Sequence, residues 1–173
     1  NIIGKDDDIG YGVLRIFPEQ KWHPVNLAQP LYALTMAILF QWGVGIQDSK
    51  IDRVLRGELK LRDTIPDLKI YAKKARGQVL KDYVAFPLLA GPAALSVFTG
   101  NMAANLIRNL WAFAIIYCGH FTEDAEVFPE SVLENETRAE WYLRQIKGSS
   151  NLDGGPLFDI LSGNLSHQIE HHL

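Results

Sequence analysis

Three long stretches with almost no formal charge constrain what this 173-residue chain can fold into. The first runs from Trp22 to Gln47 and the second from Tyr83 to Ile107. The third, from Leu106 to His120, contains Arg108 as its only formally charged side chain. About 20 apolar residues in a helix are enough to cross a bilayer. We therefore expect an all-α fold in an integral membrane protein.

The first stretch, residues 22–47, is an imperfect membrane span. Gln29 and Pro30 interrupt it, and Trp22 and Trp42 lie toward its two ends. Tryptophan is typical of the interface between lipid and water, and polar or proline-containing segments are tolerated at membrane depth where they are shielded from lipid. We expect a membrane-interfacial or re-entrant helix here.

The other two stretches together predict a transmembrane hairpin over residues 83–120, with its turn at Thr99-Gly100-Asn101. Residues 48–82, expected as a loop before the hairpin, hold ten of the seventeen Lys and Arg residues. Loops rich in Lys and Arg face the cytoplasm. Both ends of the hairpin, and the helical cap expected over residues 121–173, are therefore placed on the cytoplasmic side.

Length, charge and cysteine content narrow the possible functions. The length suits a single domain, residues 1–173. The formal net charge of -3 gives no basic surplus for binding nucleic acid. Cys118 is the only cysteine, which excludes an internal disulfide and a cysteine-rich zinc or iron–sulfur site.

The segment from Ser166 to Leu173 contains three of the five histidines in the chain. In a helix, residues three or four apart are neighbours. Gln168 would then share a face with His171 and His172, and His167 would share one with His171. Neutral imidazole is the commonest metal ligand in proteins. The cluster predicts a metal site, and a polar C-terminal tail is the alternative.

A fourth histidine, His120, ends the third apolar stretch on the same predicted side of the membrane. By itself it is typical of a solvated helix end. Combined with the downstream cluster, it becomes a candidate metal ligand.

The histidine cluster also resembles a known motif. Gln-Ile-Glu-His-His-Leu at 168–173 resembles the third histidine box of the membrane fatty acid desaturase superfamily, in its Gln-x-x-His-His form. Asn1 to Gly12, with Arg15 following, is similar to the stretch after the second box in bacterial acyl-CoA and acyl-lipid desaturases. Shorter matches occur in the family's order at Trp22-His23-Pro24, Gln29-Pro30-Leu31-Tyr32 and Gly119-His120-Phe121.

The resemblance implies a non-haem di-iron centre, with two iron ions held mainly by histidines. His120, His171 and His172 would be ligands, and Gln168 would stand where many members have a histidine. His167 departs from the pattern by one position and is expected to be a partner of a ligand or an alternative ligand. Glu170 is expected either to orient an imidazole or to face solvent.

The implied reaction is the O2-dependent introduction of a cis double bond into a fatty acyl chain carried by CoA or by a lipid. Electrons would come from an external ferredoxin- or cytochrome-type protein with its reductase. The implied location is the bacterial cytoplasmic membrane, with the active site facing the cytoplasm.

The first two histidine boxes of the family would precede Asn1. We therefore expect an internal piece of a longer enzyme, inactive by itself. A related di-iron lipid hydroxylase and a non-enzymatic zinc-binding membrane protein are the alternatives.

Overall fold

The computed structural model describes residues 2, 14–55, 57, 59–123 and 125–173. Within them every regular element is a helix, and the one β-type contact is an isolated bridge between Ile2 and Phe128. The expected all-α fold is confirmed for this part of the chain. Two compact units can be distinguished, Asn1–Leu34 with Trp111–Leu173, and Thr35–Leu110. The motif match over Asn1 to Gly12 lies outside the described residues, apart from Ile2.

The first apolar stretch folds into a 3-10 helix, Pro24–Ala28, followed by α1 (Gln29–Ile38) and α2 (Phe40–Asp48). The helical path bends by 96° where α2 begins. Among the described residues no single helix has both the length and the apolar composition of a membrane crossing, and only this bent pair reaches them jointly. The interfacial or re-entrant position of residues 22–47 stays a prediction.

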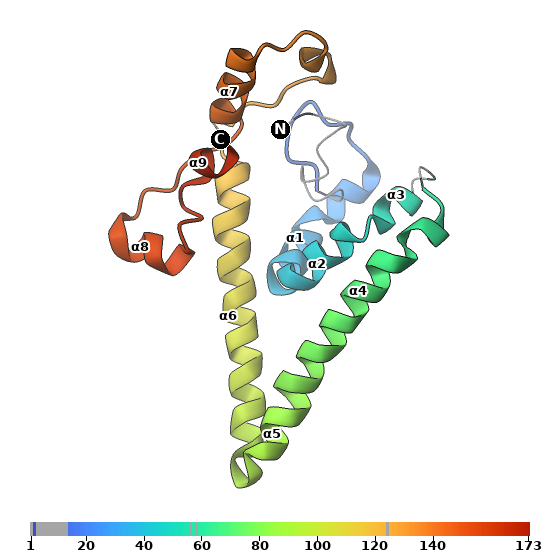
Figure 1. Cartoon of the computed structure of the whole chain (residues 1–173), viewed down its shortest axis with the longest axis vertical. Coiled ribbons are helices and arrows are strands. Elements are labelled where there is room, and N and C mark those ends of the chain that lie inside the picture. Colours follow the sequence, from blue (N-terminus) through green and yellow to red (C-terminus); the bar gives the residue numbers. More distant parts are fainter. Residues whose placement is uncertain (1, 3–13, 56, 58, 124) are drawn as a thin grey trace. The chain divides into compact units, whose positions relative to one another are not determined.

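Two long helices form a hairpin in the second unit (Figure 1). After α3 (Ile51–Leu55), the helix α4 (Leu61–Leu80) continues through a π-helical turn (Lys81–Ala85) into α5 (Phe86–Leu89). A 3-10 turn, Gly91–Ala93, then leads into α6 (Ala94–His120). The segment 48–82 is thus largely helical, and its prediction as a loop is wrong. Its many Lys, Arg, Leu and Ala residues are good helix formers.

The predicted turn at Thr99-Gly100-Asn101 is also wrong, because these residues lie inside α6. The chain reverses at Gly91 instead, whose φ of +55° lies in the left-handed region that glycine adopts without strain. Thr99 is accommodated in the helix because its hydroxyl donates to the Leu95 carbonyl oxygen at 2.9 Å. Turn-type residues therefore do not mark the turn here.

Polar side chains face the inside of this hairpin. Asn101 donates to the Asp82 carbonyl oxygen at 2.6 Å, and Asn105 donates to the Tyr83 hydroxyl at 2.9 Å. Asn109 is only 4% exposed and donates to a backbone carbonyl oxygen of α1 at 2.8 Å. The three asparagines are four residues apart and share one face of α6. Large apolar side chains are exposed instead, including Leu88, Leu89, Leu95 and Ile107. Along α6 the polar asparagines are thus more shielded than many of the large apolar side chains.

Three short helices follow α6 in the first unit: α7 (Arg138–Lys147), α8 (Gly155–Ser162) and α9 (Gln168–His172), with a 3-10 helix at Glu130–Glu134 before α7. A capping box starts α7, since Thr137 accepts from the Glu140 backbone N–H and the Glu140 carboxylate accepts from that of Thr137. Gly163, with φ of +64°, ends α8. These stops position the loop that leads into α9.

Candidate metal centre

Aromatic packing surrounds the last turn of α6, on which His120 stands. Phe113 stacks on Tyr117 with ring centroids 4.8 Å apart, and Tyr117 meets Phe121 edge to face at 5.1 Å. The ring of His120 lies 5.9 Å from that of Phe121 and is partly exposed. The imidazole is therefore carried by a well-packed helix end.

Hydrogen bonds hold the chain that leads to α9 against this helix end. Ser150 donates its backbone N–H to the Gly119 carbonyl oxygen at 3.0 Å, and the Ser150 and Thr122 hydroxyls share a hydrogen bond at 2.6 Å. Two residues later, the Leu152 N–H donates to the Ser166 carbonyl oxygen at 2.8 Å. These bonds bring the start of the histidine segment to the end of α6.

Gln168 packs against the end of α6. Its side chain is almost completely buried, at 1% exposure, and a β-carbon built on Gly119 would lie only 2.3 Å from the Gln168 Cγ. Gln168 Nε2 donates to the Leu165 carbonyl oxygen at 2.7 Å, whereas the buried Oε1 has no hydrogen-bond partner. A buried, unsatisfied oxygen is costly. Gln168 thus carries an unused acceptor on a buried side chain that packs against Gly119, the residue that precedes His120.

His167 lies outside α9, as its N-cap residue. Its Nε2 lies 3.5 Å from Asp159 Oδ1, an oxygen that also accepts from the Ser166 hydroxyl at 2.8 Å. His171 lies one helical turn after this N-cap, and the sharing of a helix face between His167 and His171 stays a prediction. The His167 imidazole is next to Asp159 of α8.

The rest of α9 is more exposed. His171 is exposed, and its backbone N–H donates to the His167 carbonyl oxygen at 3.2 Å. Glu170 accepts from Asn151 Nδ2 at 2.8 Å, and this hydrogen bond lowers the pKa of the Glu170 carboxyl. That exposed carboxylate fits the solvent-facing alternative. His172 closes α9, and its side chain lies outside the described part of the structure.

The donor atoms present fit iron in kind but not in number. Imidazoles and a carboxamide oxygen are suitable ligands, and the buried Gln168 Oε1 is an oxygen that a cation would satisfy. Within the described residues, however, no three His, Cys, Asp or Glu side chains lie close enough together to hold a metal ion. The arrangement accounts for part of a site, and the ligand set of His120, Gln168, His171 and His172 stays a prediction.

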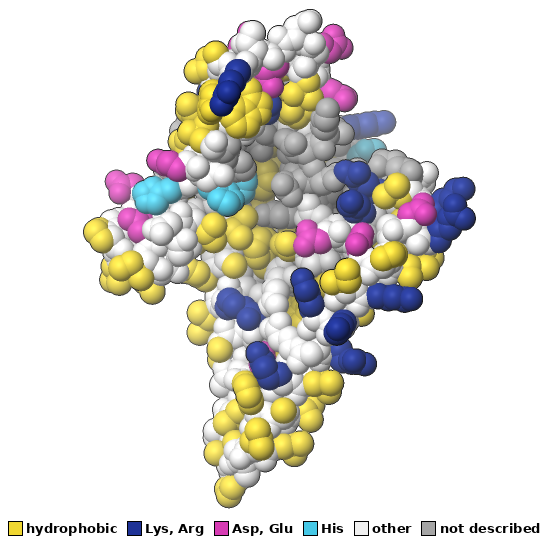
Figure 2. Space-filling view, in the orientation of Figure 1, with side chains coloured by type: hydrophobic (Ala, Val, Ile, Leu, Met, Phe, Trp, Pro, Cys, Tyr) yellow, Lys and Arg dark blue, Asp and Glu magenta, His cyan; other side chains and the backbone are white. Residues whose placement is uncertain are grey.

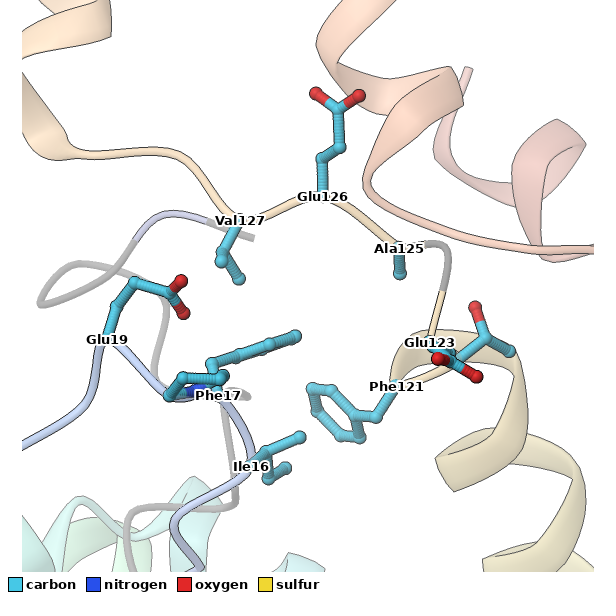
Figure 3. Close-up of a pocket in the computed structure, with 10 residues that line it drawn as sticks. Ile16, Phe17, Glu19, Phe121, Glu123, Ala125, Glu126 and Val127 are labelled. Carbon is cyan, nitrogen blue, oxygen red and sulfur yellow. The ribbon is translucent and has the colours of Figure 1, made fainter. Parts of the chain in front are cut away.

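A pocket of about 560 Å³ lies beside the end of α6, and the sequence did not indicate it. Figure 3 shows Phe17, Phe121 and Val127 pointing into it, and the Phe17 and Phe121 rings meet edge to face at 6.2 Å. Glu19 and Glu123 also line it, so a mainly apolar interior has acidic groups around it.

Gln29 is a structural residue that sequence reasoning placed only in a motif. Its side chain binds both backbone groups of Arg15, accepting from the N–H at 2.9 Å and donating to the carbonyl oxygen at 2.8 Å. Arg15 in turn donates to the Gln20 carbonyl oxygen at 2.8 Å. This network shapes the loop that supplies Phe17 to the pocket. Nothing in the sequence around Gln29 indicates that its side chain would bind the backbone of Arg15.

Comparisons with known proteins point to one family. The model described as "Fatty acid desaturase" matches residues 2–173. A relative named NADPH-dependent stearoyl-CoA 9-desaturase, from Mycobacterium tuberculosis, is 44% identical over all of this chain and 42% of its own length. An acyl-lipid (7-3)-desaturase from Rebecca salina is 30% identical over all of this chain and 39% of its own length. The chain thus spans about two fifths of these relatives. No solved structure matches it.

Proposed function

Because this chain belongs to the fatty acid desaturase family, we propose that it contributes the third histidine box and the last membrane helices of a membrane-bound fatty acyl desaturase. The observation that carries the proposal is the packing of the Gln-x-x-His-His helix, through Gln168, against Gly119 beside His120. It joins the two candidate ligand segments of the chain at one place.

The proposed iron ligands from this chain are His120, Gln168, His171 and His172. The unsatisfied Gln168 Oε1 supports the inclusion of Gln168, while the Asp159 contact of His167 supports a role for that imidazole outside the ligand set. Two iron ions, when bound, would supply the oxidising power to remove hydrogen from two adjacent methylenes, with O2 as co-substrate. The remaining ligands would come from elsewhere in the protein.

The chain's own residues would position the ligands and exclude water from them. Gly119 leaves room for Gln168, and the hydrogen bonds of Ser150 and Leu152 hold α9 in register with the end of α6. Burial of Gln168 keeps water away from its free oxygen. The substrate is proposed to be a fatty acyl-CoA or acyl-lipid, the two classes named for the relatives. Electrons would come from a separate ferredoxin- or cytochrome-type protein and its reductase.

Residues 83–120 of the hairpin are proposed to lie in the membrane, with residues 48–82 on the cytoplasmic side, residues 121–173 as a cytoplasmic cap and residues 22–47 at the interface. One buried asparagine, two half-buried ones and the exposed leucines support this placement, since polar side chains in membrane helices face the protein interior. Figure 2 shows hydrophobic side chains gathered over the α5 end of the hairpin. A cysteine placed at Ala93, in a Cys118→Ser background, should react with an impermeant maleimide from outside the cell, and one placed at Lys60 should not. Labelling in the reverse pattern would refute the topology.

The activity is tested with the full-length natural gene product, purified from membranes. We expect close to two irons per chain, and an unsaturated product by mass spectrometry when acyl-CoA or acyl-lipid is supplied with a reducing system. A hydroxylated product would identify the related hydroxylase, and one zinc without iron would identify the non-enzymatic alternative. Either result would overturn the proposal.

A matched pair of variants tests the ligand register. Gln168→Ala should lower the iron content of the purified protein more than His167→Ala, because Gln168 has a buried side-chain oxygen without a hydrogen-bond partner, whereas the His167 imidazole lies beside Asp159. Circular dichroism provides the control for folding of both variants. The opposite order of iron loss would shift the motif by one residue.

A further inference from the structure

A basic groove of about 620 Å³ lies within the second unit, between α4 and α6. Lys73 and Lys74 of α4 and Lys81 of the π-helical turn line it together with Arg108 of α6. Asp82 is the one acidic residue among those that line it, and its carboxylate lies 3.4 Å from Lys81 Nζ. Figure 2 shows Lys and Arg side chains gathered over this part of the hairpin. The groove therefore concentrates positive charge.

Most of this charge is not neutralised by the chain itself. In the part that the structure describes, Lys73, Lys74 and Arg108 form no ion pair with a carboxylate. The Arg108 guanidinium donates to the side-chain oxygen of Gln41, whose amide donates to Gln78 Oε1 at 2.6 Å. Neutral amides thus hold the guanidinium in place without compensating its charge. Clustered like charges destabilise a fold unless a counter-ion offsets them.

Gly77 lines the same groove. It follows Lys73 by four residues and therefore lies on the same face of α4. A β-carbon at Gly77 would meet nothing within 4 Å. Glycine weakens a helix interior relative to alanine, and no packing within the described residues requires it here. Its absent side chain leaves the floor of the groove open for a group to approach the helix backbone.

The groove lies where the chain changes from charged to uncharged. Lys81 and Asp82 are the last charged residues before an uncharged stretch that runs from Tyr83 to Ile107. Apolar side chains flank the cations: Ile70 lines the groove and is 56% exposed, and Ile107, next to Arg108, is 66% exposed. A ligand that fits both features carries a negative headgroup and apolar chains.

We propose that this groove binds the phosphate headgroup of an anionic phospholipid, with Lys73, Lys74 and Arg108 around the phosphate and Gly77 beneath it. The inference rests on the membrane placement of the hairpin proposed above. Basic residues next to a membrane span attract anionic lipid, and each contributes about fivefold in affinity. The lipid would thereby fix the depth of the α4–α6 hairpin at the headgroup layer.

The test uses the full-length gene product in a neutral detergent, titrated with short-chain phosphatidylglycerol while its unfolding temperature is recorded. We expect phosphatidylglycerol to raise that temperature, and phosphatidylcholine and inorganic phosphate to leave it unchanged. Lys73→Gln with Lys74→Gln should weaken the apparent affinity about 25-fold. The control, Lys69→Gln with Arg76→Gln, removes the same charge from exposed α4 positions that do not line the groove, and should change affinity less than threefold.

Gly77→Leu adds a test that leaves the charge unchanged, because it fills the floor of the groove and should abolish the phosphatidylglycerol effect. Equal stabilisation by phosphatidylcholine, an effect of inorganic phosphate without lipid, or equal losses in the two double variants would each overturn the proposal. Iron content and acyl product, measured on the same preparations, separate the two proposals. A protein without iron that still binds phosphatidylglycerol selectively would contradict the desaturase function alone.

Discussion

Gly119→Ala adds a single methyl group where α6 meets Gln168, and its consequence can be calculated from the contact. The new β-carbon would lie 2.3 Å from Gln168 Cγ, 3.1 Å from Cδ and 3.4 Å from Nε2. Because the nearest atom is close to the Gln168 backbone rather than at the free end of its side chain, a terminal rotation cannot relieve the clash. Either the side chain leaves its buried position or α9 moves away from α6.

Gly100→Ala is the matched control because it lies in the interior of the same helix, and a β-carbon there would meet nothing within 4 Å. Both variants gain about 0.5–1 kcal/mol from replacing a helical glycine. This gain cancels in the comparison, so the difference between them is the overpacking cost alone, about 1–3 kcal/mol. At roughly 2–4 °C per kcal/mol, Gly119→Ala should unfold several degrees below Gly100→Ala.

Thermal unfolding of the purified proteins measures this difference, and adding Gln168→Ala identifies its origin. Removing the Gln168 side chain from the Gly119→Ala protein should restore most of the lost stability, giving a coupling energy of about 1–2 kcal/mol. Iron content should fall in Gly119→Ala and remain normal in Gly100→Ala. Equal unfolding temperatures for the two glycine variants, or no coupling to Gln168, would refute the contact between α6 and α9.

Two further predictions concern other contacts. In α2, Gly45→Ala should lower the free energy of unfolding by about 1–3 kcal/mol relative to Gly43→Ala. The reason is that a β-carbon at Gly45 would lie 2.5 Å from the Tyr71 ring, whereas one at Gly43 would meet nothing within 4 Å. Equal thermal stability of the two variants would contradict this prediction. Arg144 donates a side-chain hydrogen bond to the Glu136 carboxylate and attracts it electrostatically. Both effects lower the pKa of the Glu136 carboxyl below its usual 4.5. Its stabilisation is therefore present above about pH 4.5 and is lost as pH falls through the lower folded-state value. Unfolding temperatures measured against pH should show a gap between wild type and Glu136→Gln at neutral pH that closes in acid, and a gap independent of pH would exclude this origin.

The fold class was predictable because it depends on composition over long windows. Uncharged stretches and good helix formers specify helices wherever they occur, and the described chain is helical throughout its regular elements. Local turn chemistry was less informative. Thr99-Gly100-Asn101 has the residues of a turn, yet the helix continues through them because Thr99 satisfies its hydroxyl within the helix and Asn101 binds Asp82. Gly91 was equally visible in the sequence, but nothing local ranked it above Gly100.

For the candidate site, too, the sequence predicted one part and the tertiary structure decided the other. The histidine-rich segment indicated a candidate metal site, and its resemblance to a known motif added Gln168 and the family, because such a motif is a property of neighbouring residues. Only the tertiary structure placed Gln168 against Gly119 and turned His167 toward Asp159. Those placements depend on where α9 begins and on hydrogen bonds between segments far apart in sequence. Pairwise geometry of that kind leaves no periodic pattern in the chain.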